Sequence, residues 1–180
     1  MKKLFFYATL LFVISCQENE KTQTIKIKNQ YSLDLPQNMS LVSNLNNEAS
    51  LQYQNIFDDL YVIVIDESKQ NINSILENDT DFSPNLNGYT QLLKTSLQTT
   101  VAHSVFSNSK KTQINGLKSY TSSLSGSVDS FQVFYEFAYI EGKSHYYQVF
   151  VWTSLEKKDE ISPKMKKIIN SFKELNSRAK

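Results

Sequence analysis

The chain contains few side chains with the chemistry of a catalytic or metal site. Its two histidines do not stand at the spacing from other ligands that a zinc site requires. Asp79-Thr80-Asp81 begins like a calcium-binding loop, but Pro84 stands where that loop needs glycine and Thr90 where it needs glutamate. With four glycines, the chain has no glycine-rich phosphate loop. These patterns predict no metal, no cofactor and no nucleotide.

Hydroxyls and carboxylates are the next candidates for catalysis. Five serines crowd residues 122–130, but none lies in the Gly-x-Ser-x-Gly turn of a serine hydrolase. The acidic pairs Asp58-Asp59 and Asp66-Glu67 could act as general acid and base, yet at strand ends they are typical of solvated turns. A hydrolase is therefore the weakest hypothesis. We predict no catalytic residue and a protein that is not an enzyme.

One residue, Cys16, has a specific chemistry because of what precedes it. Two lysines stand before an apolar run over residues 4–14, which is shorter than the ~20 residues that span a bilayer. A basic start followed by a short apolar run predicts a signal peptide over residues 1–15. An exported chain with a single cysteine also has no internal disulfide.

The end of this leader, Val13-Ile14-Ser15-Cys16, resembles the lipobox of bacterial lipoproteins. The resemblance implies cleavage after Ser15 and acylation of Cys16, whose acyl chains would hold the protein at a membrane. The next residues, Gln17-Glu18-Asn19-Glu20, resemble the acidic signal that sends lipoproteins of the Bacteroidetes to the outer face of the outer membrane. A solvated linker is the simpler interpretation of those four residues. We expect a lipid anchor in the cell envelope, at the outer membrane, on its periplasmic or its surface side.

Charge argues against nucleic acid as a partner. Removal of residues 1–15 takes away two lysines and no acid, so the formal net charge of +1 becomes −1. A nucleic-acid-binding chain of this size normally carries a basic excess.

The ten tyrosines and eleven phenylalanines are the feature most open to a functional interpretation. Aromatic side chains with a polar tip suit interfaces and ligand grooves, and they also fill cores. We predict that most fill the core and that a surplus on one hairpin forms an interaction patch. The candidate patch consists of Tyr135, Tyr139, Tyr146, Tyr147 and Trp152.

That hairpin organises the expected fold. Residues 131–140 and 144–153 alternate as strands, joined at Glu141-Gly142-Lys143, and the second is apolar on both faces as expected of a central strand. On residues 131–140 we expect one buried face. The other predicted strands cover residues 25–35, 39–43, 49–56, 60–65, 109–114 and 117–125.

Apolar residues at helical spacing predict three helical segments. These are a single turn at 71–76, a helix from 86 that ends between 99 and 104, and a closing helix that begins at Ser162-Pro163. The predicted domains are a lipidated cysteine and tether over 16–24, one globular domain over 25–176 and a frayed tail over 177–180. The expected class is α+β, with an antiparallel β-sheet of about six to seven strands flanked by helices.

The body resembles the PsbP family and the related Ran-binding Mog proteins. Four segments carry the resemblance: Tyr31-Ser32-Leu33-Asp34-Leu35-Pro36, the Gly116 hairpin, Tyr146-Tyr147-Gln148-Val149-Phe150 and Ile168-Ile169-Asn170-Ser171-Phe172. It implies an α/β/α sandwich. Because that family includes photosystem subunits and a GTPase binder, it implies no single activity.

Two hypotheses about the function remain. The first is a lipid-anchored envelope protein whose non-catalytic domain binds a protein partner or assists an envelope complex. The alternative is a carrier of a small molecule or lipid, which requires an apolar cavity between sheet and helix.

Overall fold

The structure, a computed structural model, describes residues 21–175 of the 180 in the chain. The predicted signal peptide, Cys16 and the tail over 177–180 lie outside the described residues. None of the helices between residues 21 and 175 combines the length and apolarity needed to cross a bilayer.

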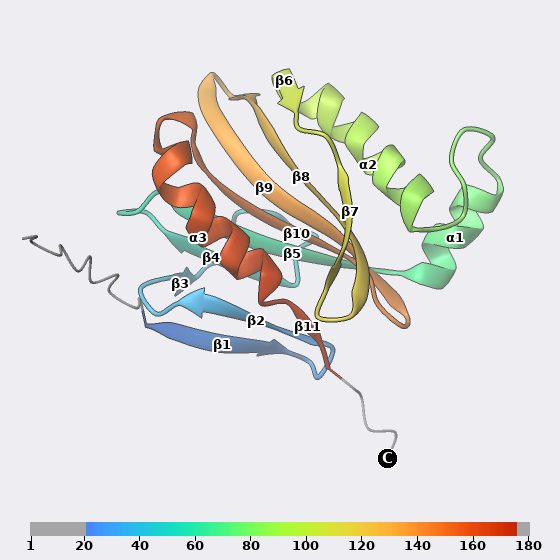
Figure 1. Cartoon of the computed structure of the whole chain (residues 1–180), viewed down its shortest axis with the longest axis horizontal. Helices are drawn as coiled ribbons and strands as arrows, with labels where there is room; N and C mark the ends of the chain where they lie inside the picture. Colours follow the sequence, from blue (N-terminus) through green and yellow to red (C-terminus); the bar gives the residue numbers. More distant parts are fainter. Residues whose placement is uncertain (1–20, 176–180) are drawn as a thin grey trace, which may run out of the picture.

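The main sheet is antiparallel and has eight strands (Figure 1). Its order is β3 (Ser40–Leu41), β4 (Leu51–Asn55), β5 (Leu60–Ser68), β10 (His145–Ser154), β9 (Phe131–Glu141), β8 (Leu117–Val128) and β6 (Ala102–Phe106), with β7 (Lys110–Ile114) also paired to β8. A smaller sheet contains β1 (Thr22–Ile27), β2 (Tyr31–Pro36) and β11 (Lys173–Glu174), in that order. The predicted antiparallel α+β class is confirmed, with the strands divided between two sheets.

Strand β10 lies between β5 and β9, as the apolar run on both of its faces predicts. Strands β7 to β10 follow one another as the expected meander. The turn between β7 and β8 is formed by Asn115 and Gly116, with φ of 49° and 85°. Both residue types tolerate this left-handed conformation, and this explains why the turn could be recognised in the sequence.

Helices cover both faces of the main sheet. On one face lie α1 (Lys69–Glu77) and α2 (Leu86–Thr100), and on the other lie α3 (Lys158–Asn170) and the small sheet (Figure 1). Strand β9 therefore has two buried faces where we expected one. Phe137 and Tyr139 pack on the α2 side, whereas Phe134, Ala138 and Ile140 pack on the α3 side.

The segment 25–35, predicted as one strand, is a hairpin. Lys28 and Asn29 have φ of 44° and 57°, and Gln30 N donates to Ile27 O at 2.7 Å. The apolar residues keep the same alternation on both sides of this turn, so the pattern hides it. Strand β1 begins at Thr22, so residues 22–24 belong to the small sheet rather than to the predicted tether.

Two further boundaries differ from the prediction. Helix α3, preceded by the short helix η1 (Leu155–Lys157), begins at Lys158 and contains Pro163, which was predicted in its first turn. Burial of Ile161 one turn before Met165 extends the apolar stripe, and Ser162 Oγ donates to Glu136 Oε1 (2.8 Å) instead of capping. Helix α2 ends within the predicted range, and the next residues form β6, an edge strand that the sequence did not predict.

Candidate functional site

The predicted aromatic patch does not exist as a continuous surface. Tyr139, Tyr146 and Tyr147 are each 1% exposed, and Tyr147 faces the opposite side of the sheet from the other two. Tyr135 and Trp152 alone among the five remain half-buried. The three tyrosines fill the core because helices or the small sheet cover both faces of β9 and β10.

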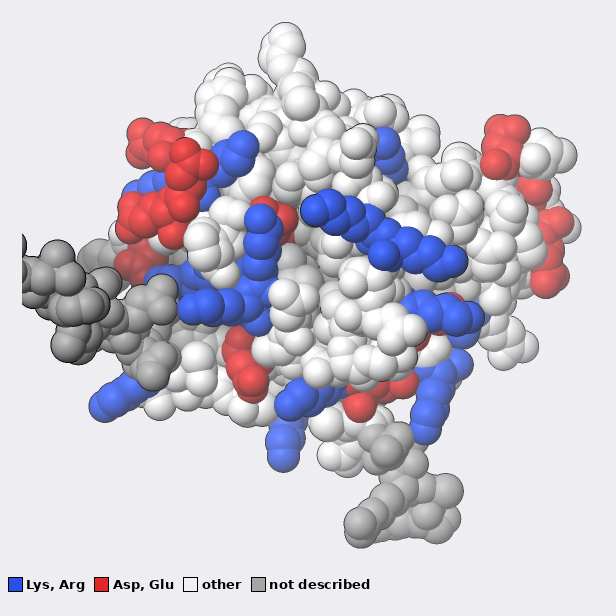
Figure 2. Space-filling view, viewed as in Figure 1, with Lys and Arg blue, Asp and Glu red and all other residues white. Residues whose placement is uncertain are grey.

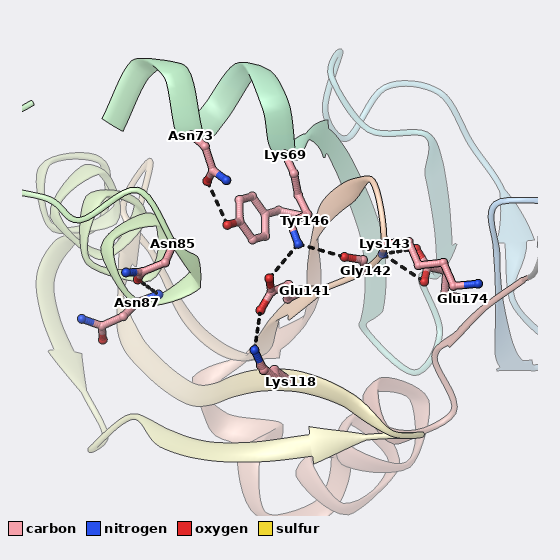
Figure 3. Close-up of polar contacts among 10 residues, drawn as sticks. All are labelled: Lys69, Asn73, Asn85, Asn87, Lys118, Glu141, Gly142, Lys143, Tyr146 and Glu174. Carbon is pink, nitrogen blue, oxygen red and sulfur yellow. Dashed lines mark hydrogen bonds and ion pairs between the residues drawn. The ribbon is translucent and has the colours of Figure 1, made fainter. Parts of the chain in front are cut away.

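Tyr146 belongs to a polar cluster that closes the β9–β10 turn (Figure 3). Its hydroxyl donates to Asn73 Oδ1 of α1 at 3.0 Å. Lys69 Nζ donates to Glu141 Oε1 at 2.6 Å, and Lys118 Nζ lies 3.7 Å from Glu141 Oε2. Since these charges pair with one another across α1, β8 and β9, we assign the cluster a structural role.

The half-buried aromatics gather at the opposite end of the sheet. In the register of β5, β10 and β9, Tyr61, Trp152 and Tyr135 form one row. The Tyr61 and Trp152 rings stack with centroids 5.3 Å apart, and Tyr135 lies 5.8 Å from Trp152. At the start of β9, Phe131 is 74% exposed. This end therefore offers aromatic surface to a partner.

A pocket of about 810 Å³, here called the end pocket, opens at the same place. It is lined by Asp59, Tyr61, Phe131, Gln132, Val133, Trp152, Thr153, Ser154, Leu155 and Glu156. Asp59 Oδ2 accepts from Ser154 N at 2.9 Å, and Glu156 makes no ion pair with any described residue. Burial, followed by the Asp59 carboxylate, raises the pKa of Tyr61.

Two residues that line the end pocket, Thr153 and Ser154, carry buried hydroxyls. Thr153 Oγ1 and Ser154 Oγ are buried and form no hydrogen bond within residues 21–175. The residues that line the end pocket include no histidine or lysine that could activate a hydroxyl as a nucleophile. The aromatic rings and carboxylates of the end pocket suit the binding of another molecule.

The turn between β4 and β5 extends this apolar surface. Its residues Ile56 and Phe57 are 61% and 88% exposed, and Phe57 O accepts from Lys157 Nζ of η1 at 3.4 Å. Sequence reasoning missed Phe57 and Phe131 as surface residues. The available signal was their position directly beside turns, at strand ends that no helix covers.

A second space lies between α2 and the sheet. This α2 cavity has a volume of about 370 Å³ and is mostly apolar, with Leu93 and Leu97 on one wall and Ile63 and Phe150 on the other. The carrier hypothesis required a cavity in this position. In the described part of the chain, no three His, Cys, Asp or Glu side chains come together as a metal site would need.

Other candidate residues have structural surroundings. Glu67 Oε2 accepts from Tyr89 Oη and from Gln148 Nε2, so this acid supports the core and does not pair with Asp66. His145 is half-buried at the start of β10, with Nδ1 2.9 Å from Ser144 Oγ.

Comparison with solved structures identifies the fold of this chain. No protein-family model matches the sequence, and no curated protein sequence matches it significantly. The solution structure of cyanobacterial PsbP (CyanoP) from Synechocystis superposes with a TM-score of 0.59 at 12% identity, covering 91% of this chain and 98% of that one. The chain has a PsbP/Mog1-like fold.

Two other solved structures support the same conclusion. The Ran-binding protein Mog1p of Saccharomyces cerevisiae has a TM-score of 0.52 at 8% identity, covering 86% of this chain and 95% of that chain. LpqN of Mycobacterium tuberculosis, involved in cell envelope biogenesis, has a TM-score of 0.52 at 9% identity, with coverages of 87% and 91%. The predicted resemblance to PsbP and Mog proteins is thus confirmed for the fold.

Proposed function

We propose that this protein is a lipid-anchored envelope protein without catalytic activity that binds a protein partner at the end pocket. The observation that carries the proposal is the 74% exposed Phe131 beside a pocket lined by further aromatic rings. Exposed aromatic residues around a concave surface are typical of binding hot spots. A binding role in the envelope agrees with two proteins of similar fold, the Ran-binding protein Mog1p and LpqN, which is involved in cell envelope biogenesis.

The charges at the end pocket favour a basic side chain from the partner. Asp59 and Glu156 supply two carboxylates, and the exposed ring of Phe131 supplies an aromatic face that attracts a cation. Figure 2 shows further acidic side chains over the start of α3, where Asp159 and Glu160 stand in the first turn. An arginine or lysine of the partner would thus meet opposite charge and aromatic rings together.

The lipid anchor restricts where this surface works. Four residues separate Cys16 from Lys21, the first described residue, and five chain steps span at most about 17 Å. Lys21 O accepts from Gln37 N at 2.9 Å, and the neighbouring Asn38 donates to Asp58 in the β4–β5 turn at 3.2 Å. The anchor would therefore hold the β4–β5 turn close to the membrane, so we expect a partner that is itself at the membrane.

Site-specific photocrosslinking in the native envelope tests the proposal. A photoreactive phenylalanine analogue at position 131 should capture one protein reproducibly, identified by mass spectrometry. The same probe at Ile75, 60% exposed on α1 at the other end of the sheet, is the matched control and should not capture it. Adding Asp59→Asn and Glu156→Gln to the position-131 probe should reduce the capture at least fivefold.

Two results would overturn this assignment. One is the absence of any protein captured from position 131, and the other is equal capture from positions 131 and 75. Capture that survives the loss of both carboxylates would refute the preference for a basic side chain.

A further inference from the structure

One buried tyrosine differs from the others in the core. Four fully buried tyrosines each have a partner for the hydroxyl: Ser50 for Tyr31, Glu67 for Tyr89, Asn73 for Tyr146 and Glu174 for Tyr147. Tyr139 is equally buried, but its Oη has no hydrogen-bond partner among residues 21–175. Burial raises the pKa of Tyr139, so the hydroxyl stays protonated and can donate. A buried donor without an acceptor is unfavourable and needs an explanation.

Tyr139 lines the α2 cavity. Leu93 and Leu97 of α2 line the cavity on the side that faces the strands, yet both are only half-buried. The C-terminal half of α2 is therefore not packed tightly against the sheet there. Ile63 and Phe150 beneath them are 7% exposed. The volume of about 370 Å³ lies in the lower part of the range of roughly 300 to 1,000 Å³ for small-molecule sites.

The sheet wall of this apolar cavity carries a polar pair. Gln148 is directly opposite Tyr139 in the β9–β10 register and also lines the cavity. Its Nε2 donates to Glu67 Oε2 at 2.8 Å, while its Oε1 accepts no hydrogen bond from the described residues. Tyr139 thus offers a donor and Gln148 an acceptor. The nearby Glu67 carboxylate disfavours a negatively charged group at the same position.

We propose that the α2 cavity binds a neutral amphiphile, an apolar chain or ring that carries a single hydroxyl group. That hydroxyl accepts from Tyr139 Oη and donates to Gln148 Oε1, and the apolar part lies between Leu93, Leu97 and Phe150. A hydroxyl group can do both, whereas a carboxylate can only accept. This ligand site adjoins the end pocket, with which it shares Trp152, but it does not depend on the proposed protein partner.

Tryptophan fluorescence gives a direct test, because Trp152 is the chain's only tryptophan and lines the cavity. The full chain with Cys16→Ser, which cannot be acylated, is titrated with decanol and with decanoate. Decanol should change the emission saturably, and decanoate should bind at least tenfold more weakly. Tyr139→Phe should weaken decanol binding roughly three- to tenfold, the usual loss for one hydrogen bond.

Two further variants locate the site. Leu97→Phe fills the cavity and should abolish the response, whereas Thr95→Phe adds the same ring to the exposed side of α2 and should leave it unchanged. Thermal unfolding checks that each variant is folded. The proposal is overturned if decanol gives no saturable change or if folded Leu97→Phe binds like the unchanged chain. Equal binding of decanoate, or loss of binding in Phe131→Ser at the end pocket, would overturn it as well.

Discussion

Removal of a single oxygen should have opposite effects at two neighbouring tyrosines. The Tyr89 and Tyr139 rings lie 6.1 Å apart, and each residue is 1% exposed. Tyr89 Oη donates to the carboxylate of Glu67, and a hydrogen bond to a charged group contributes about 1.5 to 3 kcal/mol. Tyr89→Phe should therefore lower the free energy of unfolding by about 2 kcal/mol.

Tyr139→Phe should raise the same free energy. Its Oη has no described partner, so the folded protein loses the hydration of that hydroxyl without compensation, at a cost of about 1 to 3 kcal/mol. Phenylalanine avoids this cost and keeps the ring. We expect a gain of about 1 kcal/mol in the ligand-free protein, which for a domain of this size raises the Tm by about 2 to 4 °C.

Urea unfolding followed by Trp152 fluorescence measures both variants. The slope of free energy against urea should not change, because neither substitution alters the surface exposed on unfolding. A loss of stability in Tyr139→Phe similar to that in Tyr89→Phe would refute the reasoning, since it would mean that the hydroxyl already has a partner in the ligand-free protein.

Three other predictions test the alkaline stability, the start of α2 and the anchor. Burial raises the pKa of the core tyrosines, so the folded state retains protons that the unfolded chain releases above a pH of about 10. The free energy of unfolding should therefore fall above that pH. Denaturant titrations from pH 8 to 11 should show this decrease, and a flat profile would contradict it. Gly88→Ala should lower the free energy of unfolding by about 1 to 3 kcal/mol, measured by thermal unfolding, because the added alanine Cβ would lie 1.9 Å from Ser83 O. Inside a helix, the change from glycine to alanine is usually stabilising. Cys16→Ser should move the protein from the membrane to the soluble fraction and abolish incorporation of labelled fatty acid; retention of both would exclude the lipid anchor.

Much of the secondary structure could be predicted because its signals are local. The alternation in β9, the apolar run of β10 and the Asn115-Gly116 turn each reflect a backbone preference of neighbouring residues. Where a prediction was wrong, a distant contact decided the outcome. Strand β6 forms because its residues pair with β8, although the same segment continues the apolar spacing of α2.

The candidate sites were less predictable. Alternation shows which residues of a strand share a face, but it does not show what covers that face. Tyr146 and Trp152 lie on the same face of β10, yet Tyr146 is fully buried against Tyr89 of α2, while Trp152 lies where α2 stands off the sheet. The predicted patch therefore separated into three core tyrosines and two residues beside the pockets.

The sequence by itself determined the central hairpin, the antiparallel α+β class and the aromatic content, because these follow from residue type and short-range periodicity. The tertiary structure alone decided that Tyr139 lacks a hydrogen-bond partner among residues 21–175 while four similar tyrosines have one, and that α2 leaves a cavity over the sheet. Hydrogen-bond partners and covering helices come from residues far away in the chain, such as Glu67 for Tyr89 and Leu97 above Phe150. Their positions depend on how the helices and strands pack together, and short-range sequence patterns do not specify that packing.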